Sequence, residues 1–292
     1  MFTGTYTAIV TPFKNGKIDE AALERFIDFQ IKGRVDGLVP AGTTGESSTL
    51  GYQENIDVVA RAVKFARGKI KIIAGTGANA TAEATYLTRA AEEAGADASL
   101  QVAPYYNRPT QEGLHQHFKA VASVTSLPIL LYNIPGRCGV EIAIDTVKRL
   151  AESCKNIVGI KESAGSCDRV SQLRAALGPD FVILSGDDSL ILPFMSVGAQ
   201  GVISVASNII PREISEMVKL FRAGKPAAAL RIHEKYYPLI KDLFIETNPT
   251  PVKAALAMMK FITEEYRLPL VPMDPENRNA LRATMKRCGI LK

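Results

Sequence analysis

Asn156-Ile-Val-Gly-Ile-Lys161 is a short apolar segment with the β-branched residues of a buried strand, and it ends in a single lysine. Two other segments, Lys71-Ile-Ile-Ala74 and Phe181-Val-Ile-Leu184, are also apolar and do not alternate with polar residues. Strands of this pattern are buried on both faces, which is typical of a parallel sheet covered by helices. The segments therefore predict an α/β fold.

Eight such segments occur along the chain. They end near Val10, Pro40, Ala74, Val102, Tyr132, Lys161, Ser185 and Val205. The spacing of about twenty to thirty-five residues fits one strand plus one helix. Between the first two segments, apolar residues recur at helical spacing from Leu23 to Ile31, and Gly33 follows as a stop. We predict a closed (β/α)8 TIM barrel over residues 1–224 and a C-terminal helical extension over residues 225–292.

Composition excludes several classes of protein. The 292 residues are 47% hydrophobic, and no run approaches the roughly 18 apolar residues of a membrane span. The net charge is +5, and lysine and arginine are scattered without a basic stripe, so we expect neither a membrane nor a nucleic acid as partner. The N-terminal residues lack the features of a secretory signal, which predicts a cytoplasmic location.

The cysteines and histidines do not predict a metal site. Cys138, Cys154, Cys167 and Cys288 lie far apart without a C-x-x-C pair, so we expect reduced thiols. His115 and His117 are two residues apart, which places them on different faces of a helix, and we interpret both as solvated side chains.

Gly75-Thr-Gly-Ala-Asn-Ala80 resembles the G-x-G-x-x-A turn of a dinucleotide site. Such a site needs an acidic residue at the end of the next strand, but that segment ends Leu100-Gln-Val-Ala-Pro104. We therefore interpret the stretch as a small-residue turn that permits close helix packing.

Lys161 is the strongest candidate for catalysis. Burial disfavours the charged form of a lysine, so more free amine is available to attack a carbonyl group. The simpler alternative is a strand-end lysine that reaches water. The active site of a TIM barrel lies at the carboxyl ends of its strands, and hydroxyl groups and an arginine follow other strands at that rim. These residues are Thr43, Thr44, Tyr105, Tyr106, Tyr132 and Arg137. Each alone could be structural, but together they predict a carbonyl-binding site.

Seven motifs resemble one known family. They are Gly42-Thr-Thr-Gly-Glu46, Tyr105-Tyr-Asn-Arg-Pro109, Tyr132-Asn-Ile-Pro-Gly-Arg137, Gly159-Ile-Lys-Glu162, Ser185-Gly-Asp-Asp188, Gly201-Val-Ile-Ser204 and Asn248-Pro-Thr-Pro-Val-Lys253. They are similar to the signatures of the dihydrodipicolinate synthase (4-hydroxy-tetrahydrodipicolinate synthase) family, nearly from end to end. Several motifs are shared with other pyruvate-dependent lyases and aldolases, whereas Arg137 resembles the synthase branch.

The resemblance implies a lyase that condenses pyruvate with L-aspartate 4-semialdehyde through a lysine Schiff base, in lysine and diaminopimelate biosynthesis. The implied roles are Lys161 as nucleophile, Tyr132, Thr43 and Tyr106 as a hydroxyl relay, Thr44 and Arg137 as ligands of the two substrate carboxylates, and Gly186 and Ile203 as the border of the pyruvate pocket. It also implies that neither a cofactor nor a catalytic metal takes part. A homotetramer built as a dimer of dimers is implied as well, with Tyr106 contributed across a subunit contact.

Two other functions stay open at this point. N-acetylneuraminate lyase or a keto-sugar-acid aldolase would share Lys161 and Tyr132 but accept a sugar aldehyde. A non-catalytic binding protein could use the same barrel, because a fold alone does not fix function.

The resemblance also indicates a regulatory site for lysine. The matching positions are Ser47, Ser48, Tyr52, Asn55, Asn79, Glu83 and Tyr105. Family members that lysine inhibits have histidines where this chain has Tyr52 and Asn55, so we expect a weak response to lysine. The alternative is that these two residues lie on the first turns of a solvated helix without regulatory meaning.

Overall fold

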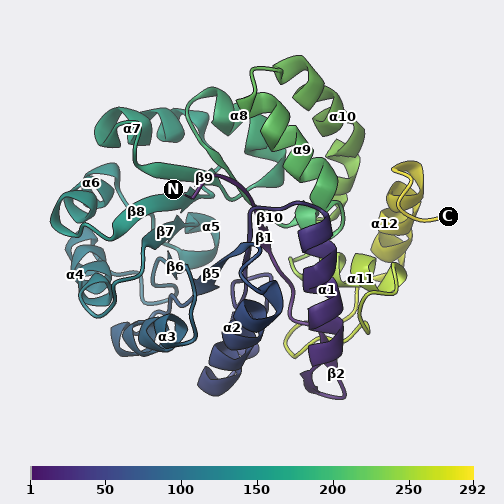
Figure 1. Ribbon diagram of the computed structural model, residues 1–292, viewed down its shortest axis with the longest axis horizontal. Coiled ribbons are helices and arrows are strands. Elements are labelled where there is room, and N and C mark those ends of the chain that lie inside the picture. Colours follow the sequence, from purple (N-terminus) through teal and green to yellow (C-terminus); the bar gives the residue numbers. More distant parts are fainter. Residues whose placement is uncertain (1) are drawn as a thin grey trace.

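The computed structural model describes residues 2–292, and its centre is a closed barrel of eight parallel strands (Figure 1). In chain order the barrel strands are β1 (Gly4–Ala8), β4 (Gly37–Val39), β5 (Lys71–Gly75), β6 (Ala98–Val102), β7 (Ile129–Asn133), β8 (Ile157–Glu162), β9 (Val182–Ser185) and β10 (Gly201–Ser204). β10 pairs in parallel with β1 and closes the barrel. The predicted TIM barrel is confirmed, and each predicted strand end lies within two residues of the observed end.

Helices surround these strands (Figure 1). They are α1 (Glu20–Lys32), α2 (Tyr52–Ala66), α3 (Thr81–Glu93), α4 (Gln111–Ala122), α6 (Ile144–Ser153), α7 (Cys167–Leu177), α8 (Ile191–Ser196) and α9 (Pro211–Arg222), and the short α5 (Pro135–Cys138) follows β7. α1 agrees with its sequence pattern, because the Asp19 side chain caps its first turn, Leu23 and Phe26 are buried, and Gly33 ends it. None of the helices in residues 2–292 is long and apolar enough to cross a bilayer.

The chain after α9 forms α10 (Pro226–Asp242), α11 (Thr250–Met258) and α12 (Pro275–Arg287). Figure 1 shows α11, in yellow-green, next to α1, and α12, in yellow, farther out, where it packs on α10 and α11. Phe261, just after α11, packs on Phe29 of α1 with ring centroids 4.6 Å apart. A small hairpin, β2 (Phe13–Lys14) and β3 (Lys17–Ile18), was not expected from the sequence.

The interpretation of His115 and His117 as solvated side chains is wrong. Both lie on α4, which packs between α3 and α6, so both rings are buried despite their spacing. Burial lowers the pKa of His117 to about 4, and its Nδ1 atom shares a hydrogen bond of 2.9 Å with the Thr81 hydroxyl. Within residues 2–292 no cluster of three or more histidine, cysteine, aspartate or glutamate side chains could hold a metal ion.

The turn Gly75–Ala80 contains small residues for a different reason from the one expected. A Cβ atom at Gly75 would collide with the backbone of Ala41, and one at Gly77 with the backbone of Val102. Neighbouring strand ends, rather than a helix, therefore approach these glycines.

Candidate active site

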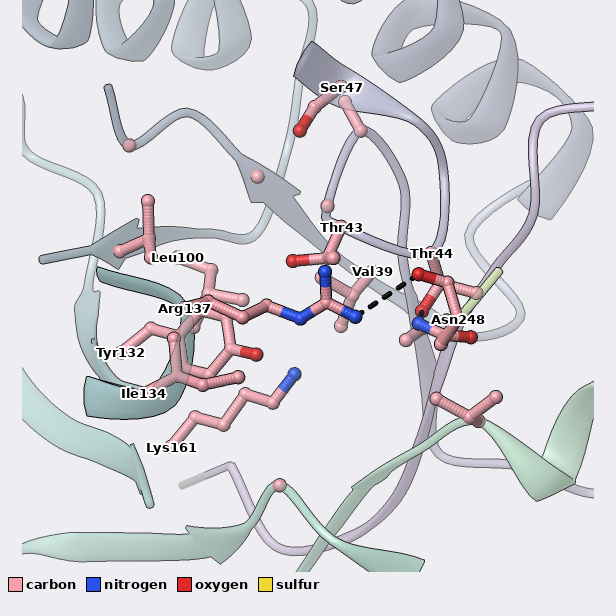
Figure 2. Close-up of a pocket in the computed structure, with 18 of the residues that line it drawn as sticks. Val39, Thr43, Thr44, Ser47, Leu100, Tyr132, Ile134, Arg137, Lys161 and Asn248 are labelled. Carbon is pink, nitrogen blue, oxygen red and sulfur yellow. Dashed lines mark hydrogen bonds between the residues drawn. The ribbon is translucent and has the colours of Figure 1, made fainter. Parts of the chain in front are cut away.

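A pocket opens at the carboxyl ends of the barrel strands, where the sequence predicted the site. Its lining includes Thr43, Thr44, Tyr132, Arg137, Lys161, Gly186, Phe244 and Asn248. Figure 2 shows Lys161, Tyr132, Arg137 and Thr43 converging on one space. The structure thus brings together most of the predicted residues, from four segments that are far apart in the sequence.

Lys161 lies near the end of β8, and its side chain is buried, with 6% of its surface exposed. Its amine lies 4.0 Å from the centroid of the Tyr132 ring, because β7 and β8 pair with these two residues in register. Gly186 leaves the space that the lysine needs, since a Cβ atom there would lie 2.8 Å from Lys161 Cε. The alternative of a strand-end lysine that reaches water is therefore wrong.

A buried polar network lies behind this pair. Glu162 follows Lys161 and is fully buried, and its carboxylate accepts hydrogen bonds from Asn133 Nδ2 at 3.0 and 3.1 Å and from Arg169 Nε at 2.9 Å. Asn133 follows Tyr132 and accepts from the Ile142 amide at 3.0 Å. Successive strand side chains point to opposite faces, so this network ties β7 to β8 outside the barrel, directly behind the lysine and tyrosine.

Asn248 connects the two predicted carboxylate ligands. Its Nδ2 atom donates to the Thr44 hydroxyl at 3.0 Å, and its backbone carbonyl accepts from Arg137 Nη2 at 3.1 Å (Figure 2). Sequence reasoning assigned no role to Asn248, because it belongs to the C-terminal extension. The Asn-Pro-Thr-Pro motif that starts with it was the available signal.

The comparisons with known proteins agree with this geometry. The model of the Dihydrodipicolinate synthetase family matches residues 1–288. The chain belongs to this family. Over 293 residues it is 53% identical to the 4-hydroxy-tetrahydrodipicolinate synthase of Persephonella marina, covering 100% of both chains.

Two solved structures are similar to this chain over nearly its whole length. The 4-hydroxy-tetrahydrodipicolinate synthase of Methylacidiphilum fumariolicum SolV is 59% identical with a TM-score of 0.98, covering 99% of this chain and 96% of that one. The dihydrodipicolinate synthase of Cyanidioschyzon merolae, solved with lysine bound, is 41% identical with a TM-score of 0.97, covering 99% of both chains. The expectation of an enzyme of the dihydrodipicolinate synthase family is confirmed.

Two residues that the resemblance to this family indicated do not line the pocket. Tyr106 is 91% exposed and has a left-handed backbone with φ of 74°. Ile203 is buried in the barrel interior in the same cluster as Tyr132, and Val205 reaches the pocket instead. The Asp188 carboxylate holds the end of β10 in place by accepting from the amide of Val205 at 2.9 Å.

A second cavity adjoins the first, and Thr43 and Arg137 line both. It measures about 220 Å³, against about 90 Å³ for the first. Five residues of the expected regulatory set line it, namely Ser47, Ser48, Asn55, Glu83 and Tyr105. Asn79 donates to the Tyr105 carbonyl at 3.2 Å, and Tyr52 stands outside the lining with 53% of its surface exposed. The solvated-helix alternative thus describes Tyr52 but not the buried Asn55.

Proposed function

We propose that Lys161 is the Schiff-base nucleophile in the condensation of pyruvate with L-aspartate 4-semialdehyde. The reaction follows from family membership, and it gives 4-hydroxy-tetrahydrodipicolinate in lysine and diaminopimelate biosynthesis. The observation that supports Lys161 is its buried amine, which ends in the pocket against the Tyr132 ring. An aldolase for sugar acids is not favoured, because the full-length relatives at about half identity are named as synthases.

The pocket residues suit each step of this reaction. The Lys161 amine attacks the pyruvate ketone and water leaves, which gives an imine. The positive imine nitrogen acidifies the methyl group, so an enamine forms and attacks the aldehyde carbon of the second substrate. The amino group of that substrate then displaces Lys161 as the ring closes. The hydroxyl groups of Tyr132 and Thr43, with that of Tyr106, move the protons, and Thr44 holds the pyruvate carboxylate. Gly186 borders the pyruvate site directly, and Ile203 supports this border from the barrel interior, in the same cluster as Tyr132.

Borohydride reduction tests the nucleophile. Borohydride added with pyruvate should inactivate the enzyme and leave a stable adduct on the peptide that contains Lys161, because it reduces the imine to an amine. Peptide mass mapping locates the adduct. A label on another lysine, or no label at all, would refute the mechanism.

Arg137 is expected to bind the carboxylate of the semialdehyde and not pyruvate. Arg137→Ala should leave pyruvate trapping intact and lower kcat/KM for the semialdehyde by about 100-fold, because a lost bidentate contact costs on the order of a few kcal/mol. The kcat/KM of Arg137→Lys, which keeps the charge but not the bidentate geometry, should lie between the wild-type and Arg137→Ala values. Steady-state rates with each substrate varied measure the effect, and equal loss toward both substrates contradicts this division.

We further propose that the enzyme is a homotetramer, a dimer of dimers, in which Tyr106 enters the site of a neighbouring subunit. Two features of Tyr106 support this proposal. An aromatic side chain that is 91% exposed leaves a large apolar surface in water, and a non-glycine residue at φ of 74° needs surroundings that hold it. Sedimentation measures the subunit number.

Mixed oligomers test whether Tyr106 acts across the contact. Tyr106→Phe and Lys161→Met chains are each expected to be nearly inactive alone. Coexpressed, they should recover about a quarter of the wild-type activity, because each mixed dimer contains one complete site and half of the random dimers are mixed. A mixture as inactive as its parents means that Tyr106 acts within its own chain.

Lysine is expected to inhibit weakly. The regulatory set still offers the Glu83 carboxylate and several hydroxyls, but two imidazole contacts are replaced by Tyr52 and Asn55. Two lost contacts of about 1 kcal/mol each weaken binding roughly thirtyfold. Initial rates against lysine decide the question, and half-inhibition at submillimolar lysine would contradict the prediction. Tyr52→His/Asn55→His should raise the sensitivity, because it restores two imidazole contacts to the ligand.

We also propose a boundary between the two parts of the chain and a location in the cell. We place the boundary between the catalytic barrel, residues 1–224, and the helical extension, residues 225–292, in the turn between α9 and α10. We also keep the proposal of a cytoplasmic location, which fractionation of cells that express the protein would test.

A further inference from the structure

A buried ion pair joins the C-terminal extension to the loop Gly42–Glu46, which carries Thr43 and Thr44. The side chains of Lys253, on α11, and Glu46 are fully buried, and the Lys253 amine donates to one carboxylate oxygen of Glu46. The two residues are 207 positions apart. The mechanism above uses neither of them.

Both members of the pair have their partners inside the protein. Lys253 Nζ also lies 4.3 Å from the centroid of the Phe13 ring and 5.4 Å from that of Tyr266. The backbone amide of Arg267 donates to the second carboxylate oxygen of Glu46 at 3.2 Å. The Lys253 amine is thus held in place and is not a second nucleophile. A buried ion pair is often no more stabilising than an apolar pair of the same volume, so stability alone gives little reason for this one.

The ion pair fixes a turn that needs support. Glu46 has a left-handed backbone with φ of 57°, which a non-glycine residue adopts at a cost. Its amide donates to the Thr43 carbonyl at 3.1 Å, and the Gly45 amide donates to the Gly42 carbonyl at 3.0 Å. The buried Glu46 side chain thus holds the end of the loop that carries the two threonines.

Lys253 holds the start of α11 on the other side of its contact with Glu46. The Lys253 amide donates to the Pro249 carbonyl at 3.0 Å in the first turn of α11, so the lysine side chain anchors the turn that follows Asn248. Asn248 in turn bonds to Thr44 in the pocket (Figure 2). The loop and the start of α11 thus meet twice, through Thr44 and Asn248 at the pocket and through Glu46 and Lys253 in the interior.

We propose that Glu46 and Lys253 are positioning residues that set Thr44 against Asn248 and so determine the affinity for the carboxylate of the keto acid. The proposal rests on the function proposed above, in which Thr44 holds the pyruvate carboxylate. It gives the C-terminal extension a role in substrate binding.

The double variant Glu46→Gln/Lys253→Met tests the proposal. Glutamine keeps an acceptor for the Arg267 amide, and methionine keeps the apolar stem against Phe13, so no buried charge is left alone. The KM for pyruvate should rise about tenfold or more while kcat changes less than about threefold, because only the orientation of the carboxylate site is lost. The pyruvate concentration that gives half-maximal borohydride trapping should shift by the same factor without the aldehyde present.

A matched control removes another ion pair of the extension. Arg278 and Glu264 pair at 2.6 Å, and neither forms a hydrogen bond or ion pair with Glu46 or Lys253. Arg278→Met/Glu264→Gln keeps an acceptor for the Tyr266 hydroxyl, so it should leave the KM for pyruvate unchanged. An unchanged KM in the folded Glu46→Gln/Lys253→Met protein overturns the proposal, and so does a fall in kcat and thermal stability alone.

Lys253→Arg provides a second test should the double variant not fold. It keeps the charge but puts a larger group in a filled site, and an unaltered KM for pyruvate there also overturns the proposal. No trapping at Lys161 in the unaltered enzyme would instead overturn the proposed function.

Discussion

Lys161→Met is expected to abolish borohydride-dependent labelling by pyruvate and to lower kcat by at least about 10⁴-fold, because among residues 2–292 no other lysine lines the pocket to form the imine. Methionine has nearly the length of the lysine stem and keeps the contact with the Tyr132 ring. The variant should therefore fold and bind pyruvate without reacting. Mass spectrometry of the intact protein after reduction measures the label, and a coupled assay measures kcat.

Lys71→Met is the matched control. Lys71 is also carried by a barrel strand and lies over an aromatic ring, with its amine 4.6 Å from the centroid of Phe2, but it begins β5 at the other end of the barrel. Labelling and turnover should be normal in this variant. Full labelling of Lys161→Met would show that another amine forms the imine.

Arg169→Met is expected to lower the free energy of unfolding by about 3–5 kcal/mol, because it leaves the fully buried Glu162 carboxylate without its cation. Arg169→Met/Glu162→Gln should recover part of this loss, since the two substitutions act on one network. Urea unfolding at pH 7 measures both effects.

Arg149→Met provides the control for the loss of an arginine. Arg149 pairs with Glu112 at 2.9 Å, but both side chains are about half exposed, so its removal should cost at most about 1 kcal/mol. A cost for Arg169→Met as small as this would mean that the network behind Lys161 contributes little to holding β7 and β8 together.

Much of the fold followed from local patterns. Unalternating apolar strands such as Phe181–Leu184 predicted burial on both faces, and β9 is buried throughout. The interpretation of His117 as solvated was wrong, because a spacing of two residues on a helix does not show how many neighbouring helices cover each side chain. It also gave the wrong reason for Gly75 and Gly77, since an approaching backbone from another strand leaves no mark on the local sequence.

The sequence by itself determined the barrel, the family resemblance and Lys161 as the candidate nucleophile, because strand and helix periodicity and the end of a buried strand are local properties. Only the tertiary structure decided which residues meet at that lysine. Asn248 contacts Thr44, and Lys253 contacts Glu46, across about 200 residues of sequence. Asn248 contacts Arg137 across about 110 residues. Such contacts depend on how the C-terminal helices pack on the closed barrel, and no short-range pattern in the chain encodes that packing.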